Sequence, residues 1–220
     1  MDKIEKDHFK RVRKNPFCVG DLDSPSMLVM QMAVDINHRS IQTIKNPPYE
    51  LVIFAVKKNA SVMKYITDQP DEINLLAVSI NPRVIKYIDN PSEQVQLAAI
   101  SKMGVLVGNI PNPSPEVQMA AVNDTPEAVS RIINPTQEVQ YKVLVKHYTN
   151  FRHIVNPSLE TTDRYLDDFS RERPSRHHVG DLSNCNFSDE EWWKLVQKWP
   201  QYHHLMKLNQ DQINYAILCA

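Results

Sequence analysis

The chain has 220 residues, a net charge of −1 and 42% hydrophobic residues, which is the composition of a globular protein with a sizeable core. A charge so close to zero provides no overall field that would attract nucleic acid or an acidic membrane. Only 4 glycines stand against 15 prolines, which argues against a glycine-rich loop that cradles phosphate.

The N-terminal stretch MDKIEKDHFKRVRKNP lacks the apolar core of a secretory signal. No segment approaches the ~18 apolar residues that a membrane span needs. Cys18, Cys185 and Cys219 are far apart and form no CxxC pair, a pattern typical of reduced thiols. We therefore expect a cytoplasmic protein, and we interpret residues 2–14 as the first helix of an N-terminal cap unit that spans residues 1–24.

From residue 25 onward one phrase recurs. IDNPSEQVQLAAI is followed 22 residues later by IPNPSPEVQMAAV, and 22 residues later again by IINPTQEVQYKVL. The marker prolines are Pro25, Pro47, Pro70, Pro91, Pro113, Pro135 and Pro157. Asn is a good N-cap and Pro suits the first helical position. We therefore predict that the residue before each marker caps a helix, with capping-box spacing at Asn90–Glu93 and Asn134–Gln137, and that the Pro70 repeat is one residue short.

The residues that follow each marker predict which face of this helix is buried. Positions four, eight and nine after the marker carry small or branched apolar residues, as in Val95, Ala99 and Ile100. This spacing places them in one stripe on a short helix. The other predicted core residues are Val29, Leu51, Ile73, Val117, Val139, Ala33, Ala55, Ala77, Ala121, Val143, Val34, Val56, Val78, Val122 and Leu144.

A second short helix is predicted before each marker. It opens with a proline in NPFCVGDL, NPRVIKYI and TPEAVSRI, and caps in similar places are offered by Asn37, Asn59 and Thr149. Each unit would then be two short helices in one period of the repeat. Because helices under ~12 residues are marginal in water, the pairs must be held by stacking on their neighbours. The sequence therefore predicts an all-α repeat fold.

The pattern continues in weaker form toward the C-terminus. Ser188 and Asn209 take the place of the marker, and about nine extra residues precede Ser188. The predicted core residues of these two helices are Trp192, Val196, Ile213 and Ile217. We expect one domain, residues 1–220, with regular repeats at 25–166, an irregular insertion at 167–187 and degenerate C-terminal repeats with a cap at 188–220.

The phrase N-P-S-x-x-V-Q-x-A-A-[IV] resembles short helical repeats of uncharacterised bacteriophage and large-virus proteins. It is similar, more loosely, to HEAT-type and leucine-rich-variant α-solenoids. The resemblance covers residues 16–166 well and 188–220 weakly. It implies a right-handed α-solenoid, here of about eight to nine two-helix repeats of ~22 residues each. Such a solenoid would act as a binding scaffold in the host cytoplasm by occupying or inhibiting a host factor. The resemblance assigns no catalytic residue to this chain.

Two columns on the shorter helix, four and five residues before each marker, vary in character. Variable polar, aromatic and cationic residues at equivalent exposed positions are typical of a recognition surface, and Tyr and Arg are frequent interface anchors. The alternative is an ordinary solvated face. The candidate binding residues in these columns are Lys64, Tyr65, Lys86, Tyr87, Arg131, Arg152 and His153.

Two further sets of polar residues could bind a partner. A glutamine column at Gln96, Gln118 and Gln140 could present amides to a ligand, but such columns more often form hydrogen bonds between neighbouring units. Basic clusters could follow a phosphate backbone, which makes a nucleic-acid-binding repeat protein the alternative function. These basic residues are Lys10, Arg11, Arg13, Lys14, Arg171, Arg173 and Arg176.

No enzyme motif occurs: the chain has no Walker loop, GxGxxG, nucleophile elbow or HExxH. Glu190 and Glu191 are adjacent, so they face different sides of a helix. Several histidines and one cysteine could suggest a metal site, but they lack the spacing of metal ligands: His177, His178, His203, His204 and Cys185. The tryptophans are interpreted as packing residues of the terminal repeats: Trp192, Trp193 and Trp199. We predict a protein-binding scaffold that is not an enzyme and needs no metal or cofactor. A repeat-built glycosylase is the least favoured alternative.

Overall fold

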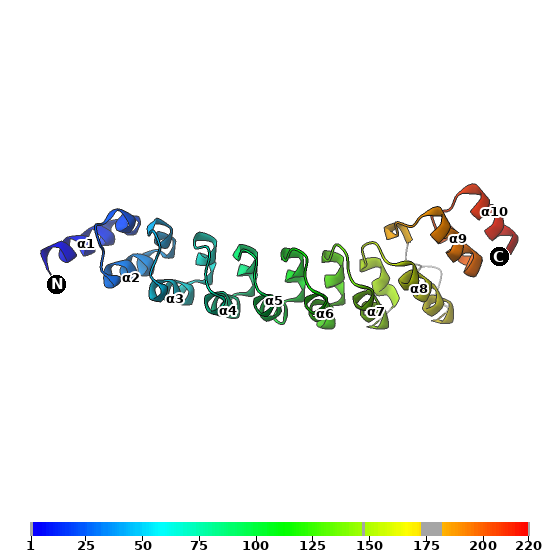
Figure 1. The fold of residues 1–220 in the computed structure, drawn as a ribbon, viewed down its shortest axis with the longest axis horizontal. Coiled ribbons are helices and arrows are strands. Elements are labelled where there is room, and N and C mark those ends of the chain that lie inside the picture. The colour runs from blue at the N-terminus through cyan, green and yellow to red at the C-terminus, as the bar shows by residue number, and fades with distance from the viewer. Residues whose placement is uncertain (1, 147, 173–181, 220) are drawn as a thin grey trace. The chain divides into compact units, whose positions relative to one another are not determined.

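The computed structural model describes residues 2–146, 148–172 and 182–219. These residues are helical and turn structure without a β-strand (Figure 1), which confirms the predicted all-α class. The chain divides into two compact units, Met1–Ile110 and Pro111–Ala220. Each unit is described by itself.

In the first unit, α-helices alternate with six-residue 3-10 helices, which are labelled η. Within this unit each α-helix contacts the next α-helix, and each η helix contacts the next η helix, so the two kinds lie in separate layers (Figure 1). The elements in chain order are α1 Lys3–Lys14, η1 Pro16–Asp21, α2 Met27–Ile36, η2 His38–Thr43, α3 Tyr49–Lys58, η3 Ala60–Tyr65, α4 Asp71–Ile80, η4 Pro82–Tyr87, α5 Glu93–Ile100 and η5 Gly104–Asn109.

The second unit begins with the same alternation. Its elements are α6 Pro115–Asp124, η6 Pro126–Arg131, α7 Gln137–Lys146, η7 Tyr148–His153, α8 Leu159–Glu172, η9 Leu182–Asn184, α9 Asp189–Lys198, η10 Pro200–Leu205 and α10 Gln210–Cys219. The predicted irregular insertion at 167–187 is wrong for its first part. Helix α8 continues through residues 167–172 because Phe169 is buried at 5% exposure on the face that begins with Tyr165 and Leu166. Residues 173–181 lie outside the described part.

Asparagines at the end of the α-helices start the 3-10 helices. The side-chain Oδ1 atoms of Asn15, Asn37, Asn59 and Asn81 accept from the backbone N–H two residues further on, at 3.1, 3.0, 2.9 and 3.1 Å. These bonds satisfy one free donor at each helix start. The predicted caps at Asn37 and Asn59 are therefore confirmed, whereas Thr149 lies inside η7.

The residues before the marker prolines do not cap the α-helices, so that prediction is wrong. Ser24, Asn46, Asn90, Asn112 and Asn156 instead adopt the left-handed conformation, with φ between 47° and 50°. Asn tolerates this conformation better than most residues.

In the regular repeats the N-cap of the α-helix is the residue after the marker. Ser92 Oγ accepts from the Val95 N–H at 3.4 Å, and Thr136 Oγ1 accepts from the Val139 N–H at 3.4 Å. The capping boxes predicted from Asn90 and Asn134 are therefore replaced by these hydroxyl caps.

The repeat around Pro70 is complete, not one residue short. Asp68 has the left-handed φ of 55°, and Pro70 is the N-cap of α4. Pro70 thus occupies the place of Ser92, and Gln69 the place of the marker proline. With Gln69 as the marker, every step from Pro25 to Pro157 is 22 residues.

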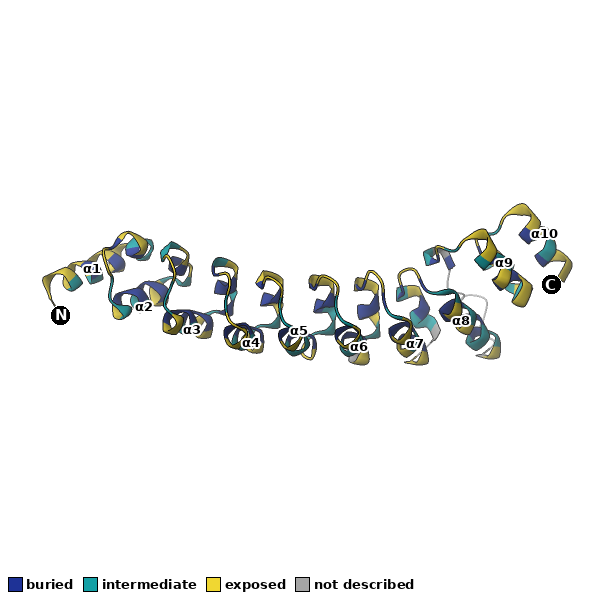
Figure 2. Cartoon of the chain, viewed as in Figure 1, coloured by how far each residue is buried: buried dark blue, intermediate teal, exposed yellow. Residues whose placement is uncertain are grey.

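The predicted core columns of residues 25–166 are all buried, as in Val95 and Ala99, which are 0% exposed (Figure 2). Trp192 and Val196 are buried as well. The prediction fails in α10, where Ile217 is 62% exposed and Ile213 is half-buried. Asn209 itself caps α10 by accepting from the Gln212 N–H at 3.0 Å. The buried face is therefore shifted by one residue, to Gln212 and Ala216.

Candidate binding surface

Two lysine–tyrosine pairs lie at equivalent ends of neighbouring 3-10 helices in the first unit. Lys64 Nζ lies 4.6 Å from the Tyr65 ring centroid, and Lys86 Nζ lies 4.9 Å from that of Tyr87. A buried isoleucine follows each pair, Ile66 after Tyr65 and Ile88 after Tyr87. An ammonium group over an aromatic face is a favourable cation–π contact. Because η3 contacts η4, the fold brings these four predicted residues onto one surface.

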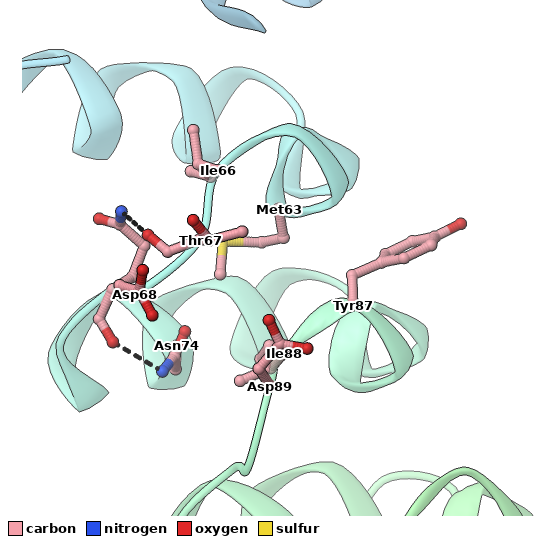
Figure 3. A pocket seen from close by; sticks show the side chains of 9 residues that line it. Met63, Ile66, Thr67, Asp68, Asn74, Tyr87, Ile88 and Asp89 are labelled. Carbon is pink, nitrogen blue, oxygen red and sulfur yellow. Dashed lines mark hydrogen bonds between the residues drawn. The ribbon is translucent and has the colours of Figure 1, made fainter. Parts of the chain in front are cut away.

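The two tyrosine side chains differ in their exposure to solvent. Tyr87 is 37% exposed and Tyr65 is half-buried, whereas both lysines are exposed. Tyr87 borders a small polar depression, but in Figure 3 its side chain extends away from that depression. The phenol is therefore available at the surface and is not used to fill a cavity.

That depression is too small for an organic ligand. Its volume is about 40 Å³, compared with the roughly 300–1,000 Å³ of ordinary ligand pockets, although it has room for water. Asn74 lies in it and donates from Nδ2 to the Gln69 carbonyl at 3.1 Å (Figure 3). The surface near Tyr87 is thus suited to an extended partner and not to a small enclosed molecule.

The glutamine column holds neighbouring repeats together. Gln118 Nε2 donates to the Pro113 carbonyl at 3.0 Å, and its Oε1 accepts from the Thr136 N–H at 3.0 Å. Gln140 makes the same pair of bonds one repeat later, with the Pro135 carbonyl and the Ser158 N–H. The interpretation of this column as an inter-repeat hydrogen-bond ladder is confirmed for these two residues.

The predicted residues of the second unit lie at the ends of η6 and η7, which contact each other. Arg131 and Arg152 are exposed, and His153 is half-buried. Arg152 Nε and His153 Nε2 are 3.2 Å apart. These positions are equivalent to those of Lys64, Tyr65, Lys86 and Tyr87, but they carry no lysine–tyrosine pair.

Packing, not recognition, explains one other member of these columns. Gly20 belongs to the same column as Lys64 and Lys86. A Cβ atom at Gly20 would lie 2.1 Å from the Thr43 carbonyl oxygen. The backbones of η1 and η2 therefore approach too closely for a side chain at Gly20, so this member of the column serves packing and not recognition.

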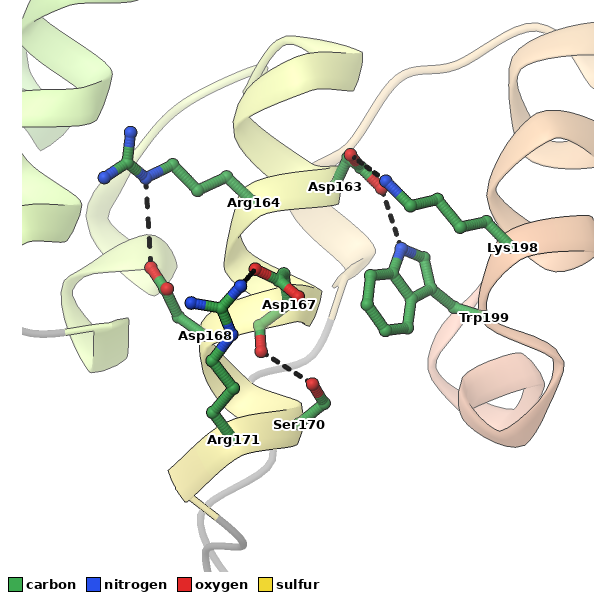
Figure 4. A network of polar contacts seen from close by, with 8 residues as sticks. All are labelled: Asp163, Arg164, Asp167, Asp168, Ser170, Arg171, Lys198 and Trp199. Atoms are coloured by element: carbon green, nitrogen blue, oxygen red, sulfur yellow. Dashed lines mark hydrogen bonds and ion pairs between the residues drawn. The ribbon is translucent and has the colours of Figure 1, made fainter.

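A polar network on α8 was missed by sequence reasoning (Figure 4). Asp163 accepts from Lys198 Nζ at 2.6 Å and from Trp199 Nε1 at 2.7 Å, which ties α8 to α9 and the start of η10. Along α8 itself, Arg171 pairs with Asp167 at 2.5 Å and Arg164 with Asp168 at 3.9 Å. The i, i+4 pairs are visible in the sequence, but the contact of Asp163 with residues 35 and 36 positions away is not.

Most charges of this network are paired with a charge of opposite sign. A shallow depression of about 500 Å³ is lined by four acidic and three basic residues: Glu160, Asp163, Asp167, Asp168, Arg164, Arg171 and Lys198, with Tyr141 beside them. Partial burial and a hydrogen bond to Glu160 raise the pKa of Tyr141, and that bond together with one from Gln137 lowers the pKa of Glu160. The hydrogen bonds thus favour the ionised form of Glu160, and Asp163, Asp167 and Asp168 each pair with a cation, which suits structural pairing better than acid–base chemistry.

The residues considered for other chemistry have packing or capping roles where they are described. Trp192 is buried, and Trp193 packs on Tyr215 with ring centroids 5.1 Å apart. Glu190 pairs with Lys194 at 3.0 Å, while Glu191 forms a capping box with Ser188.

Metal-binding clusters and membrane-spanning helices are both absent from the described ranges. Within them, no group of three His, Cys, Asp or Glu residues could hold a metal ion, and no helix is long and apolar enough to cross a membrane. Arg173, Arg176, His177 and His178 lie outside those ranges.

No family model matches the chain, and no curated protein or solved structure gives a significant match. The resemblance to viral helical repeats stays a prediction.

Proposed function

We propose that the protein is a right-handed α-solenoid of about eight to nine two-helix repeats, each of ~22 residues, that serves as a protein-interaction scaffold. Its short-helix layer would hold the partner. The observation that supports this most directly is the recurrence of a lysine–tyrosine pair at the same position of η3 and η4. The uniform repeat spacing, with contacts between successive helices of each kind inside a unit, supports the architecture.

The chemistry of the pairs favours a protein partner. Tyrosine offers a large amphipathic surface, and tyrosine is among the residues that most often anchor interfaces. The lysine ammonium lying over each ring places a cation beside that anchor, where a carboxylate of the partner can reach it. Arg131 and Arg152 offer further cations on the corresponding helices of the second unit.

The long-helix layer is less suited to this role. Its conspicuous polar column, Gln118 and Gln140, is already used in bonds between repeats. An enzymatic function such as a glycosylase would need a deep pocket with convergent carboxylates, and the pockets near the described carboxylates are either very small or open and salt-bridged. Nucleic-acid binding by the short-helix layer remains the alternative function.

The repeat phrase suggests a viral protein that binds or inhibits a host factor in the host cytoplasm. A pull-down from host lysate, followed by mass spectrometry, would identify the partner. We expect the double variant Tyr65→Ala/Tyr87→Ala to lower the melting temperature by no more than about 4 °C, since Tyr87 is exposed, Tyr65 is half-buried and neither ring belongs to the core. Its affinity for the identified partner should fall by about tenfold or more if both rings are anchors.

Tyr49→Ala provides the matched control, because Tyr49 is 45% exposed and lies on α3 in the other layer. It should leave partner affinity unchanged. Equal affinity of the double variant and the wild type would contradict a binding role for the short-helix layer.

A further inference from the structure

The outer face of α1 carries an unusually concentrated positive charge. Residues 2–14 contain six Lys or Arg residues and three Asp or Glu residues, in a chain whose net charge is −1. The helix buries His8 and Val12, which are 7% and 0% exposed. Four exposed cations project away from this buried side, namely Lys6, Lys10, Arg13 and Lys14, and the exposed Asp7 lies at the margin of the same face, where it pairs with Arg11.

These four cations are available to a ligand. None of them forms an ion pair in the part of the chain that the structure describes, whereas Arg11, which projects from another side of α1, lies 4.0 Å from Asp7. The four cations and Phe9 lie together in one open surface patch on α1. The surface therefore combines four cations with one aromatic ring and has no acidic residue in its lining.

Helix stabilisation explains only half of this arrangement. Cations in the last turn of a helix interact favourably with its dipole, which accounts for Arg13 and Lys14. Lys6 lies near the N-terminal end, where a positive charge is unfavourable, and Lys10 lies in the middle. Their alignment with Lys14 at i, i+4 spacing produces a row of ammonium groups about 6 Å apart along the axis.

We propose that this face of α1 binds a single-stranded nucleic acid, independently of the protein-binding surface on the short helices. The row of cations would contact successive phosphates, and Phe9 at its edge would stack on a base. A cationic track beside an aromatic ring is the usual construction of sites that bind single strands without sequence preference.

The same observations argue against the other anionic partners. An acidic membrane is contacted by a helix whose apolar face enters the lipid, but the apolar face of α1 is occupied by the core contacts of Val12. An acidic peptide would use the cations but would leave Phe9 without a role. The test therefore measures the contribution of the cations and that of the Phe9 ring in separate variants.

Binding of a labelled 12-nucleotide oligo-dT to the full chain can be followed by fluorescence anisotropy between 50 and 200 mM salt. With three to four phosphate contacts, log K should fall with log salt at a slope of about −2 to −3. The variant Lys6→Gln/Lys10→Gln/Arg13→Gln should bind at least tenfold more weakly, and its slope should be shallower than about −1. Arg11→Gln removes one cation from another side of the same helix and should bind as the wild type does.

Phe9→Leu tests the base contact while keeping an apolar side chain for packing, and circular dichroism verifies that each variant is folded. We expect it to weaken oligo-dT binding by about tenfold with an unchanged salt slope. Wild-type affinity in the triple variant would overturn the proposal. So would polyglutamate or anionic vesicles that compete as well as oligo-dT, or a Phe9→Leu variant that binds oligo-dT as tightly as the wild type.

Discussion

Gln140 offers the sharpest test of how the repeats are joined. Its side chain is 4% exposed. Its Nε2 donates to the Pro135 carbonyl at 2.9 Å, and its Oε1 accepts from the Ser158 N–H at 2.9 Å. Ser158 caps α8 by accepting from the Thr161 N–H at 3.1 Å. A single amide therefore connects the start of its own helix to the start of the next one.

The variant Gln140→Ala leaves both the Pro135 carbonyl and the Ser158 N–H without a hydrogen-bond partner. A buried donor or acceptor left unpaired costs about 1–3 kcal/mol, so the two together give a loss of about 2–6 kcal/mol. Water that enters the vacated space would form hydrogen bonds with part of the unpaired groups. We therefore expect the free energy of unfolding, measured in urea, to fall by about 2–4 kcal/mol. Hydrogen exchange should also show faster exchange of the Ser158 amide.

Gln137→Ala is the matched control, because Gln137 lies on the same helix and is exposed. Its bonds to Tyr141 and Glu160 are at the surface. Surface substitutions of this kind usually change stability by no more than about 0.5 kcal/mol, and we expect the same small loss here. Equal losses in the two variants, or unchanged exchange at Ser158, would refute the assignment of Gln140 as the inter-repeat connector.

Three other substitutions probe separate features. Asn74→Gln should stabilise the protein by about 1 kcal/mol in urea unfolding, because the longer amide can fill the cavity of about 40 Å³ and reach the next repeat as Gln118 does; a loss of stability would contradict this. Gly20→Ala should cost about 1–3 kcal/mol by thermal unfolding, since its Cβ meets the Thr43 backbone, whereas Gln42→Ala, in the same column, should be neutral. Hydrogen bonds from the Ser188 backbone and side chain lower the pKa of Glu191, so its contribution is present above about pH 4.5 and is lost as the pH falls through the folded-state pKa. Glu191→Gln should therefore show a flatter stability profile below that pH, and an unchanged profile would count against the capping box.

The core could be predicted from the sequence because burial follows local spacing. Val95, Ala99 and Ile100 lie on one stripe of any helix that begins near Pro91, so a one-residue error in the cap does not move them. In α10 a one-residue error did change the predicted buried face. The prediction treats Asn209 as the equivalent of the marker proline, but it occupies the position of the serine cap. Ile217 was therefore assigned to the wrong face.

The position of the caps could not be decided from residue types alone. Asn, Pro and Ser all favour helix starts, and the chain places all three in a row. Only the backbone distinguishes them, since the left-handed φ of Asn90 ends the preceding segment and leaves Ser92 as the cap. The register error at Pro70 has the same origin.

Only part of the candidate binding surface could be predicted from the sequence. The adjacency of Lys86 and Tyr87, and its recurrence one repeat earlier as Lys64 and Tyr65, is visible in the sequence. Whether the ammonium lies over the ring depends on side-chain rotamers and is visible only in the structure. The link from Asp163 to Lys198 and Trp199 spans a segment without the repeat period, so no spacing rule could have indicated it.

The bond from Gln118 to the Thr136 N–H has a consequence for how such a chain can change its length. Residues 113–134 carry the acceptor Gln118 and also Ser114, whose backbone N–H is equivalent to that of Thr136. A tandem duplication of this segment creates one new junction, at which Gln118 of the first copy can accept from the Ser114 N–H of the second copy. Gln118 of the second copy keeps the bond from the Thr136 N–H, so the repeat register is unchanged. The number of repeats can therefore change while the contacts between neighbouring repeats stay the same.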